Sequence, residues 1–303
     1  MELPDDNERF NDPKRTSLQG QNATNTTTTL VGISVPAPAA VEPVAGGFDF
    51  RAAFKTTGAA AAIKTALYLT EPGNTVAISP NDLHQDGLGD CFLISSIGEL
   101  AMTNAASITN MIKVNANGTE TVTLYEEASG KLPVPGYTGA FKAVTEVVNN
   151  LFNSSSVNSG ATQDVVNGVK EIWPQVIEQA VAQLNGGISA ISSGGYPFVA
   201  MEELTGKQAS WLFQPASSMT ASQLFTQIQG YIKAGDMLTF DTPSSPTGYN
   251  LVGGHCYMFD GLSGSGASAS VTLLNPWGVD EPSSAIPLSK LAGNICQIDI
   301  GHS

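Results

Sequence analysis

Positively charged side chains are scarce in this sequence, and their scarcity excludes one large class of partners. The 303 residues include 13 Lys and Arg against 27 Asp and Glu, which gives a formal net charge of −14. No cluster of basic residues exists that could follow a phosphate backbone, so nucleic acid is not expected as a partner. The negative field favours solubility and the binding of cations.

Cysteine and histidine are also rare, with three residues of each type. Cys91, Cys256 and Cys296 are odd in number and widely spaced, so they do not form the framework of a small disulfide-rich domain. No C-x-x-C pair occurs, which excludes the common zinc motifs. At least one thiol must therefore stay free in a monomer.

Long apolar runs are absent as well. No segment is a run of the roughly 20 apolar residues that a membrane-spanning helix needs, so no membrane partner is expected. The first residues, MELPDDNERFNDPKR, lack a basic stretch followed by an apolar core, so no secretory signal is predicted. A cytoplasmic location and export without an N-terminal signal peptide both stay open, as does the oligomeric state.

Composition divides the chain into three parts. Residues 1–46 are rich in Thr, Asn, Pro, Ala and Gly, which predicts a disordered arm or a propeptide-like extension. Residues 47–206 show mainly helical patterns, and residues 207–303 show one helix followed by short β-like runs. A helix-rich lobe followed by a strand-rich lobe predicts an α+β protein with a cleft between the lobes.

Individual elements can be placed from periodicity and from flanking Gly and Pro. In the first lobe the pattern predicts helices over residues 59–69, 91–102, 138–152 and 171–187, and a strand over 119–124. In the second lobe it predicts a helix over residues 222–235 and strands over 236–240, 255–262, 270–278 and 295–300.

A polar, glycine-broken loop meets an apolar helical run at Cys91, within HQDGLGDCFLISSIGEL. A cysteine in an apolar stretch is most often a small buried hydrophobic residue. Here, however, Asp90 suits the N-cap position, so Cys91 falls in the first turn, where the helix dipole favours the nucleophilic thiolate. Gly87 and Gly89 leave room for a substrate backbone. The side-chain amide of Gln85 and the Cys91 N–H are suited to bind an oxyanion.

A nucleophilic thiol needs a base, and His255 is the best placed of the histidines. His84 is expected in a loop, and His302 near a frayed end. If the β-like runs on either side of a Gly/Ser turn pair as an antiparallel hairpin centred on Ser265, position 255 lies opposite Asn275. An Asn carbonyl can hold an imidazole in the tautomer that serves a thiol. Taken singly, a satisfied polar His at a strand end and a turn at Asn275 are the commoner explanations.

The motifs around these residues resemble the calpain family of cysteine proteases. QDGLGDCFLISSI resembles the active-site segment of that family, GGHCYMFDGL its histidine segment, and LLNPWG its asparagine segment. EIWPQVIEQAVAQLNGG and IPLSKLAGNICQIDI resemble a helix and the last strand of the protease core. The resemblance covers most of residues 75–300, which is the protease core only. It implies a papain-like two-lobed fold, with the active site in the cleft.

The resemblance also implies a role for each motif residue. Cys91 would be the nucleophile, His255 the base, Asn275 the residue that orients His255, and Gln85 the second oxyanion donor. Trp277 would cover the His–Asn pair or lie between the lobes, the alternative being a buried core aromatic. The sequence departs from the family at two places. Phe92 stands where the family usually has Trp, and VDEPSSAIPL replaces an acidic, Trp-rich stretch.

The activity implied is that of a hydrolase of the thiol protease class, an endopeptidase that cleaves protein or peptide substrates through a thioester on Cys91. Two alternatives stay open. A papain-fold acyl transferase would use Asp where this chain has Asn275. A catalytically silent papain-fold module would bind partners without turning them over.

Calcium is the one cofactor that the resemblance implies, with one site in each lobe. Asp82 and Glu178 lie where the carboxylate ligands of the first lobe are expected, and calcium takes six to eight oxygens. Glu281 is retained where the second site would be, but the acidic stretch after it is missing. We therefore expect at most one calcium ion, in the first lobe. The alternative is that Asp82 is a turn residue and Glu178 a solvated helix carboxylate.

Overall fold

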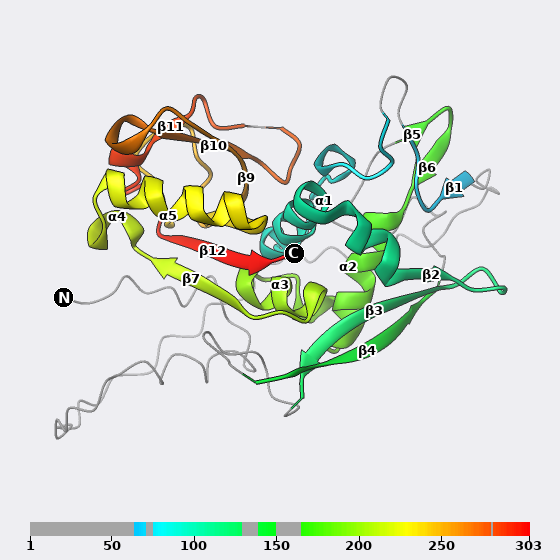
Figure 1. Ribbon diagram of the computed structural model, residues 1–303. Coiled ribbons are helices and arrows are strands. Elements are labelled where there is room, and N and C mark those ends of the chain that lie inside the picture. Colours follow the sequence, from blue (N-terminus) through cyan, green and yellow to red (C-terminus); the bar gives the residue numbers. More distant parts are fainter. Residues whose placement is uncertain (1–63, 71–74, 129–138, 150–164, 280) are drawn as a thin grey trace, which may run out of the picture. The chain divides into compact units, whose positions relative to one another are not determined.

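The computed structural model describes residues 64–70, 75–128, 139–149, 165–279 and 281–303 (Figure 1). All of these residues belong to one compact unit of the chain. The arm predicted over residues 1–46 lies outside the described residues, as do residues 59–63 of the helix predicted over 59–69. The described end of that segment is a short strand, β1 (Lys64–Ala66), so the helix prediction is wrong there.

Before residue 207, the described residues form three α-helices and two three-stranded sheets. The helices are α1 (Cys91–Met111), α2 (Trp173–Leu184) and α3 (Pro197–Thr205), and short 3-10 turns lie at Pro80–Asp82 and Ile188–Ala190. One sheet has the strand order β1-β6-β5, with β5 at Val165–Val166 and β6 at Val169–Glu171. The other has the order β2-β3-β4, with β2 at Ile112–Val114, β3 at Glu120–Glu127 and β4 at Phe141–Val148.

Strand β4 overturns the helix predicted over residues 138–152. Its eight residues pair antiparallel with β3, from Glu120↔Val148 to Glu127↔Phe141. The segment holds Val144, Thr145, Val147 and Val148, and β-branched side chains fit a pleated surface better than a helix. The apolar spacing that suggested a helix was therefore less informative than the presence of a partner strand.

The rest of the chain forms a six-stranded antiparallel sheet covered by a helix. The strand order is β11-β10-β9-β8-β12-β7, and α5 (Ala221–Ala234) packs on β8 (Figure 1). The bounds are β7 Ala209–Phe213, α4 Pro215–Ser218, β8 Asp236–Asp241, β9 Cys256–Ser263, β10 Ser270–Leu274, β11 Ile286–Pro287 and β12 Gln297–His302. The α+β class predicted from the sequence is confirmed.

The β9–β10 hairpin forms as predicted, but its register differs. The observed pairs run from Ser270↔Ser263 to Leu274↔Met258, with a shift at residue 260. If this register continued, Asn275 would lie opposite Tyr257. The sequence prediction had placed Asn275 opposite His255, two residues earlier in the chain. The 3-10 turn Gly266–Ser268 moves the centre of the hairpin beyond Ser265, and the bulge at residue 260 reverses one residue of that shift.

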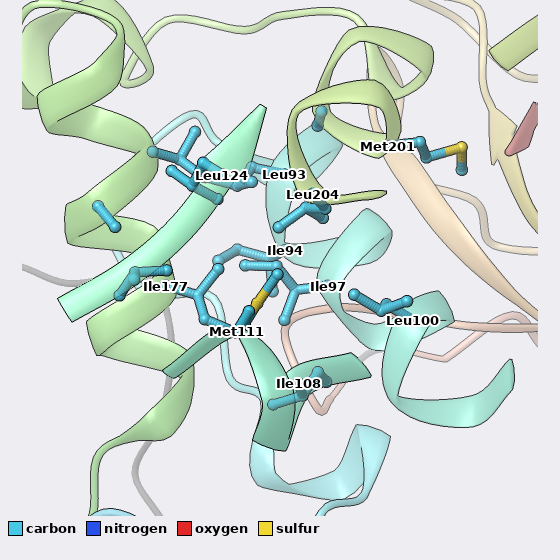
Figure 2. Packing of buried hydrophobic residues seen from close by; sticks show 14 of the residues in the cluster. Leu93, Ile94, Ile97, Leu100, Ile108, Met111, Leu124, Ile177, Met201 and Leu204 are labelled. Carbon is cyan, nitrogen blue, oxygen red and sulfur yellow. The ribbon is translucent and has the colours of Figure 1, made fainter. Parts of the chain in front are cut away.

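Buried apolar side chains gather in two clusters. The first surrounds α1, α2, α3 and β3 (Figure 2); in it Leu93, Ile94 and Ile97 of α1 pack near Leu124 and Ile177. The second lies between α5 and the six-stranded sheet. Helix α1 was expected to bury one face, but almost every side chain from Phe92 to Ala101 is buried. The reason is that α1 contacts both α3 and the strands β8 and β9.

Helix α1 is also long and apolar enough, by length and composition alone, to cross a membrane. The sequence pattern did not reveal this, because polar residues interrupt its apolar run. In its most hydrophobic window 61% of the residues are buried inside the fold. Such burial is typical of the central helix of a globular protein, which is apolar on all sides.

Candidate active site

A cleft of about 540 Å³ lies where the loop before α1 meets the loop before β9. Cys91, His255, Gln85 and Trp277 all line it, so four of the residues singled out in the sequence share one cavity. Asn275 lies directly behind His255. Two glycines from each of three loops also line the cleft: Gly87, Gly89, Gly194, Gly195, Gly253 and Gly254. Two of these backbones are in contact, since the N–H of Gly194 donates to the carbonyl of Gly89 at 2.7 Å.

Cys91 is the first residue of α1 and is half-buried. Asp90 occupies the N-cap position, as predicted, but its carboxylate does not cap the helix. Its carbonyl instead accepts the N–H groups of Leu93 and Ile94, at 2.8 and 3.0 Å. The thiol therefore lies in the turn whose N–H groups carry the positive end of the helix dipole.

The carboxyl of Asp90 is fully buried and belongs to a polar network under the cleft. It accepts a 3.2 Å hydrogen bond from Nε2 of Gln85 and forms another with Glu178 of α2. Burial raises the pKa of Asp90, and its hydrogen bonds offset part of that shift.

Gln85 lines the cleft, but its amide hydrogens are engaged. Nε2 donates to the carbonyl of Leu88 at 2.8 Å as well as to Asp90. The backbone N–H of Gln85 donates to the carbonyl of Pro276 at 2.7 Å, which ties this loop to the segment after β10. An amide nitrogen has two hydrogens, so one of these bonds must break before Gln85 can donate to a substrate.

His255 and Asn275 are in direct contact. Nε2 of His255 lies 2.8 Å from Oδ1 of Asn275, and the two residues are only 4% and 2% exposed. Because a carbonyl oxygen only accepts, Nε2 carries the hydrogen and Nδ1 is left to take up a proton. The backbone of His255 is fixed by Thr242, which accepts its N–H at 2.9 Å and donates its own N–H to the His255 carbonyl at 2.9 Å.

Trp277 lies over the imidazole. The ring centroids of Trp277 and His255 are 4.6 Å apart and tilted by 46°, and Tyr257 packs edge-on from another direction at 5.0 Å. The backbone N–H of Trp277 donates to Oδ1 of Asn275 at 3.1 Å. The covering position implied by the sequence is therefore present, and it shields the His–Asn hydrogen bond from solvent.

Glu281 supports Asn275, a contact that sequence reasoning missed. Its Oε2 accepts the backbone N–H of Asn275 at 2.7 Å. The sequence had suggested it only as the remnant of a calcium site. Thr242 was missed too, because nothing in its local sequence indicates that its backbone pairs with residue 255.

The remaining histidines and cysteines have other surroundings. His84 is a loop residue beside Gly278, as expected. His302 is not frayed, because it belongs to β12 and its Nδ1 lies 2.6 Å from Asp236. Cys256 borders the cleft, but burial above all, and then the charge of Asp241, raise the pKa of its thiol well above the usual value, which keeps it protonated.

The two carboxylates predicted to bind calcium are occupied by protein contacts. Oδ2 of Asp82 accepts the N–H of Ser79 at 2.8 Å and Nε1 of Trp173 at 3.1 Å. Glu178 is fully buried and is hydrogen-bonded to Asp90, so it is not a solvated carboxylate either. Among the described residues no group of three or more His, Cys, Asp or Glu is arranged to hold a metal ion. This donor set does not fit a calcium site, and no catalytic step is assigned to calcium here.

Comparisons with known proteins relate the chain to one family of proteases. A family model described as calpain family cysteine protease matches residues 68–286. The calpain-2 catalytic subunit of Macaca fascicularis is 27% identical over 216 residues, which cover 65% of this chain and 28% of that subunit. The Homo sapiens subunit is 26% identical over the same length, and the Gallus gallus subunit 32% over 119 residues, which cover 36% of this chain and 16% of that subunit. The chain thus spans little more than a quarter of these mammalian relatives.

Proposed function

Because the chain belongs to the calpain family of cysteine proteases, we propose that it is an endopeptidase with Cys91 as nucleophile and His255 as base. The observation that carries the proposal is the 2.8 Å hydrogen bond between His255 and Asn275 beside a cleft that Cys91 also lines. Proteins or peptides are the proposed substrates, bound along the glycine-lined walls of the cleft.

In the acylation step, the thiol proton of Cys91 passes to Nδ1 of His255. The sulfur then bonds to the carbonyl carbon of the scissile peptide. As the C–N bond breaks, the imidazolium gives its proton to the leaving amine, and the acyl group stays on Cys91 as a thioester. Water attacks the thioester in the second step, with His255 again accepting a proton, and the free thiol is restored.

Asn275 and Trp277 act on the imidazole rather than on the substrate. The Asn275 carbonyl holds the Nε2 hydrogen, which fixes the ring so that Nδ1 is the nitrogen that exchanges protons. Trp277 covers this bond, and a hydrogen bond away from water is electrostatically stronger. Both effects favour the imidazolium that forms during each step.

Negative charge develops on the carbonyl oxygen of the substrate during both steps. The Cys91 N–H at the start of α1 and the Gln85 amide are the proposed donors to this oxyanion. Gln85 would give up its longer hydrogen bond, the one to Asp90 at 3.2 Å, and keep the 2.8 Å bond to Leu88. The oxyanion hole thus forms fully only when substrate is present.

The division into an arm over residues 1–46, a first lobe over 47–206 and a second lobe over 207–303 is part of the same proposal. In it, α1 brings the nucleophile from the first lobe, and the loops before β9 and after β10 bring His255 and Asn275 from the second.

The two alternatives make different predictions. An acyl transferase would join an added amine to the substrate instead of releasing new amino termini. In a silent module, Cys91 would be alkylated no faster than an ordinary thiol in another protein. The Asn275 amide favours the protease over the transferase, and the pairing of His255 with Asn275 is unexplained in a silent module.

The test is digestion of casein and of a peptide library by the wild type, by Cys91→Ala and by Cys256→Ala, with new amino termini identified by mass spectrometry. We expect cleavage by the wild type and by Cys256→Ala, and none by Cys91→Ala. Turnover by Cys91→Ala, or loss of turnover in Cys256→Ala alone, would show that the nucleophile is a different residue.

A further inference from the structure

Helix α1 carries a buried carboxylate that the proposed mechanism does not use. Glu99 lies eight residues after Cys91, a distance of about 12 Å along the helix, and is only 2% exposed. Its Oε2 accepts the backbone N–H of Leu238 in β8 at 3.1 Å, and its Oε1 accepts the N–H of Phe259 in β9 at 2.5 Å. One side chain thus joins the nucleophile helix to two strands of the six-stranded sheet.

The two N–H groups belong to residues that face each other. Strands β8 and β9 pair at Asp241↔Cys256, Phe240↔Tyr257 and Thr239↔Met258, and the ladder stops there. The next opposed pair would be Leu238 and Phe259, and the Glu99 carboxylate accepts both of their N–H groups. The carboxylate therefore binds the two N–H groups that would belong to the next residue pair of the β8–β9 ladder, beside the β9 bulge at residue 260.

Two further contacts hold the same stretch of α1 against β9. Oγ of Ser95 donates to the carbonyl of Cys256 at 3.0 Å. Gly98 packs so closely that a Cβ atom there would lie 2.1 Å from Sδ of Met258. From Ser95 to Glu99, α1 thus follows β9 from residue 256 to residue 259. We call this contact the α1–β9 seam.

The seam begins within a few residues of both proposed reacting groups. Cys91 is the first residue of α1, and His255 immediately precedes the first residue of β9. A shift of α1 along or away from β9 would therefore change the separation of the thiol and the imidazole. Of the seam contacts, only that of Glu99 fixes both β9 and its neighbour β8.

We propose that Glu99 is a positioning residue, which holds Cys91 and His255 at the separation needed for proton transfer by bridging α1 to β8 and β9. This inference rests on the proposed function, because it concerns the same pair of reacting groups. A glutamine at this position has the same shape but only one acceptor oxygen. One of the two N–H groups would then face an NH₂ group, and the seam would have to shift.

The chain offers a matched control in Glu202 of α3. Glu202 is also fully buried, and its Oε1 accepts a backbone N–H, that of Ala209, at 3.0 Å. Burial raises the pKa of both Glu99 and Glu202 to about 8. The charge nearest to Glu99 is that of Asp260, and those nearest to Glu202 are Glu127 and Glu203. Glu202 does not belong to the seam, so Glu202→Gln removes a similar carboxylate without loosening α1 from β9.

The experiment compares the wild type, Glu99→Gln and Glu202→Gln as full chains. Iodoacetamide is added at pH values from 5 to 9, and alkylation of the Cys91 peptide is followed by mass spectrometry, with the peptide of half-buried Cys296 as internal reference. In Glu99→Gln we expect alkylation at pH 6 to slow by about tenfold and the midpoint of the pH profile to rise by about one unit toward that of a free thiol. Glu202→Gln should keep the wild-type profile even if its melting temperature falls by as much as that of Glu99→Gln.

Wild-type profiles in both variants would overturn the positioning role, and peptide cleavage by the wild type would show that the proposed function survives that result. Conversely, a wild type that cleaves no peptide, but whose Cys91 profile shifts only in Glu99→Gln, would support the positioning role while the proposed function fails. If Glu99→Gln shows no cooperative melting, Ser95→Ala carries the same test, since it removes the neighbouring bond to Cys256. A smaller shift in the same direction is expected, and an unchanged profile would count against the seam.

Discussion

Replacement of Asn275 by alanine tests how much of the activity depends on the orientation of the imidazole. Oδ1 of Asn275 accepts two hydrogen bonds, from His255 at 2.8 Å and from the Trp277 N–H at 3.1 Å. Asn275→Ala removes this single acceptor, and with it both hydrogen bonds, from a site where His255 is 4% exposed, so water cannot easily replace it. The imidazole would then be free to rotate or to change tautomer between turnovers.

The size of the effect follows from the type of bond that is lost. His255 becomes positively charged during each step, and a hydrogen bond to a charged group contributes about 1.5–3 kcal/mol. Each 1.36 kcal/mol of transition-state stabilisation is tenfold in rate, so kcat/KM should fall by about 10- to 150-fold. The loss should lie in kcat, because Asn275 does not line the cleft and makes no proposed contact with substrate.

The assay is hydrolysis of a fluorogenic peptide at pH 7, with thermal melting as a check on folding. Asn294→Ala is the matched control, since Asn294 is also a buried asparagine but bonds to Lys290 and Thr247, away from the cleft. Its melting temperature should fall without a change in kcat. An Asn275→Ala variant that keeps full kcat, or loses activity only through KM, would refute the reasoning.

The remaining predictions concern the cover, the buried carboxyls, calcium and the arm. Trp277→Ala should lower kcat by about tenfold, because solvent reaches the His–Asn bond, whereas retained activity would show that the ring only fills space. The pKa of Glu202 is raised to about 8, mainly by burial, so its contribution to stability is full below about pH 4.5 and is lost as the pH rises to about 8. Urea unfolding should show a smaller loss in Glu202→Gln than in the wild type, the remainder being due to Glu99, whose pKa is raised in the same way, and equal pH slopes would contradict this. Since the Asp82 carboxylate already accepts two N–H groups, calcium in place of chelator should leave the melting temperature unchanged, and a rise that Asp82→Asn abolishes would place an ion there. Wild-type chain should lose part of residues 1–46 on incubation while Cys91→Ala does not, and identical amino termini would argue against self-processing.

The features that sequence could predict are those set by neighbouring residues. The start of α1 at Cys91 follows from a glycine-broken loop that meets an apolar run, and the structure begins the helix at that residue. Pro174 is an equally local signal, because proline suits the first turn of a helix, and α2 begins at Trp173. The β9–β10 hairpin was predictable because its two strands are separated by only a short turn.

The features that sequence missed depend on distant partners. In residues 141–148 the apolar spacing suggests a helix whereas the β-branched residues favour a strand, and the pairing with β3 decides between them. Glu99 was indistinguishable from an exposed helix residue until β8 and β9 were placed beside it. The same holds for Glu281, whose contact with Asn275 depends on how the chain turns after Trp277.

Trapping of the covalent intermediate tests the central claim most directly. The full chain is mixed with an activated peptide ester and quenched in acid within milliseconds, and the site of the acyl group is found by tandem mass spectrometry. The account predicts one acyl group, as a thioester on Cys91, in the wild type and none in Cys91→Ala. An acyl group on another residue, or ester turnover by Cys91→Ala at the wild-type rate, would contradict it.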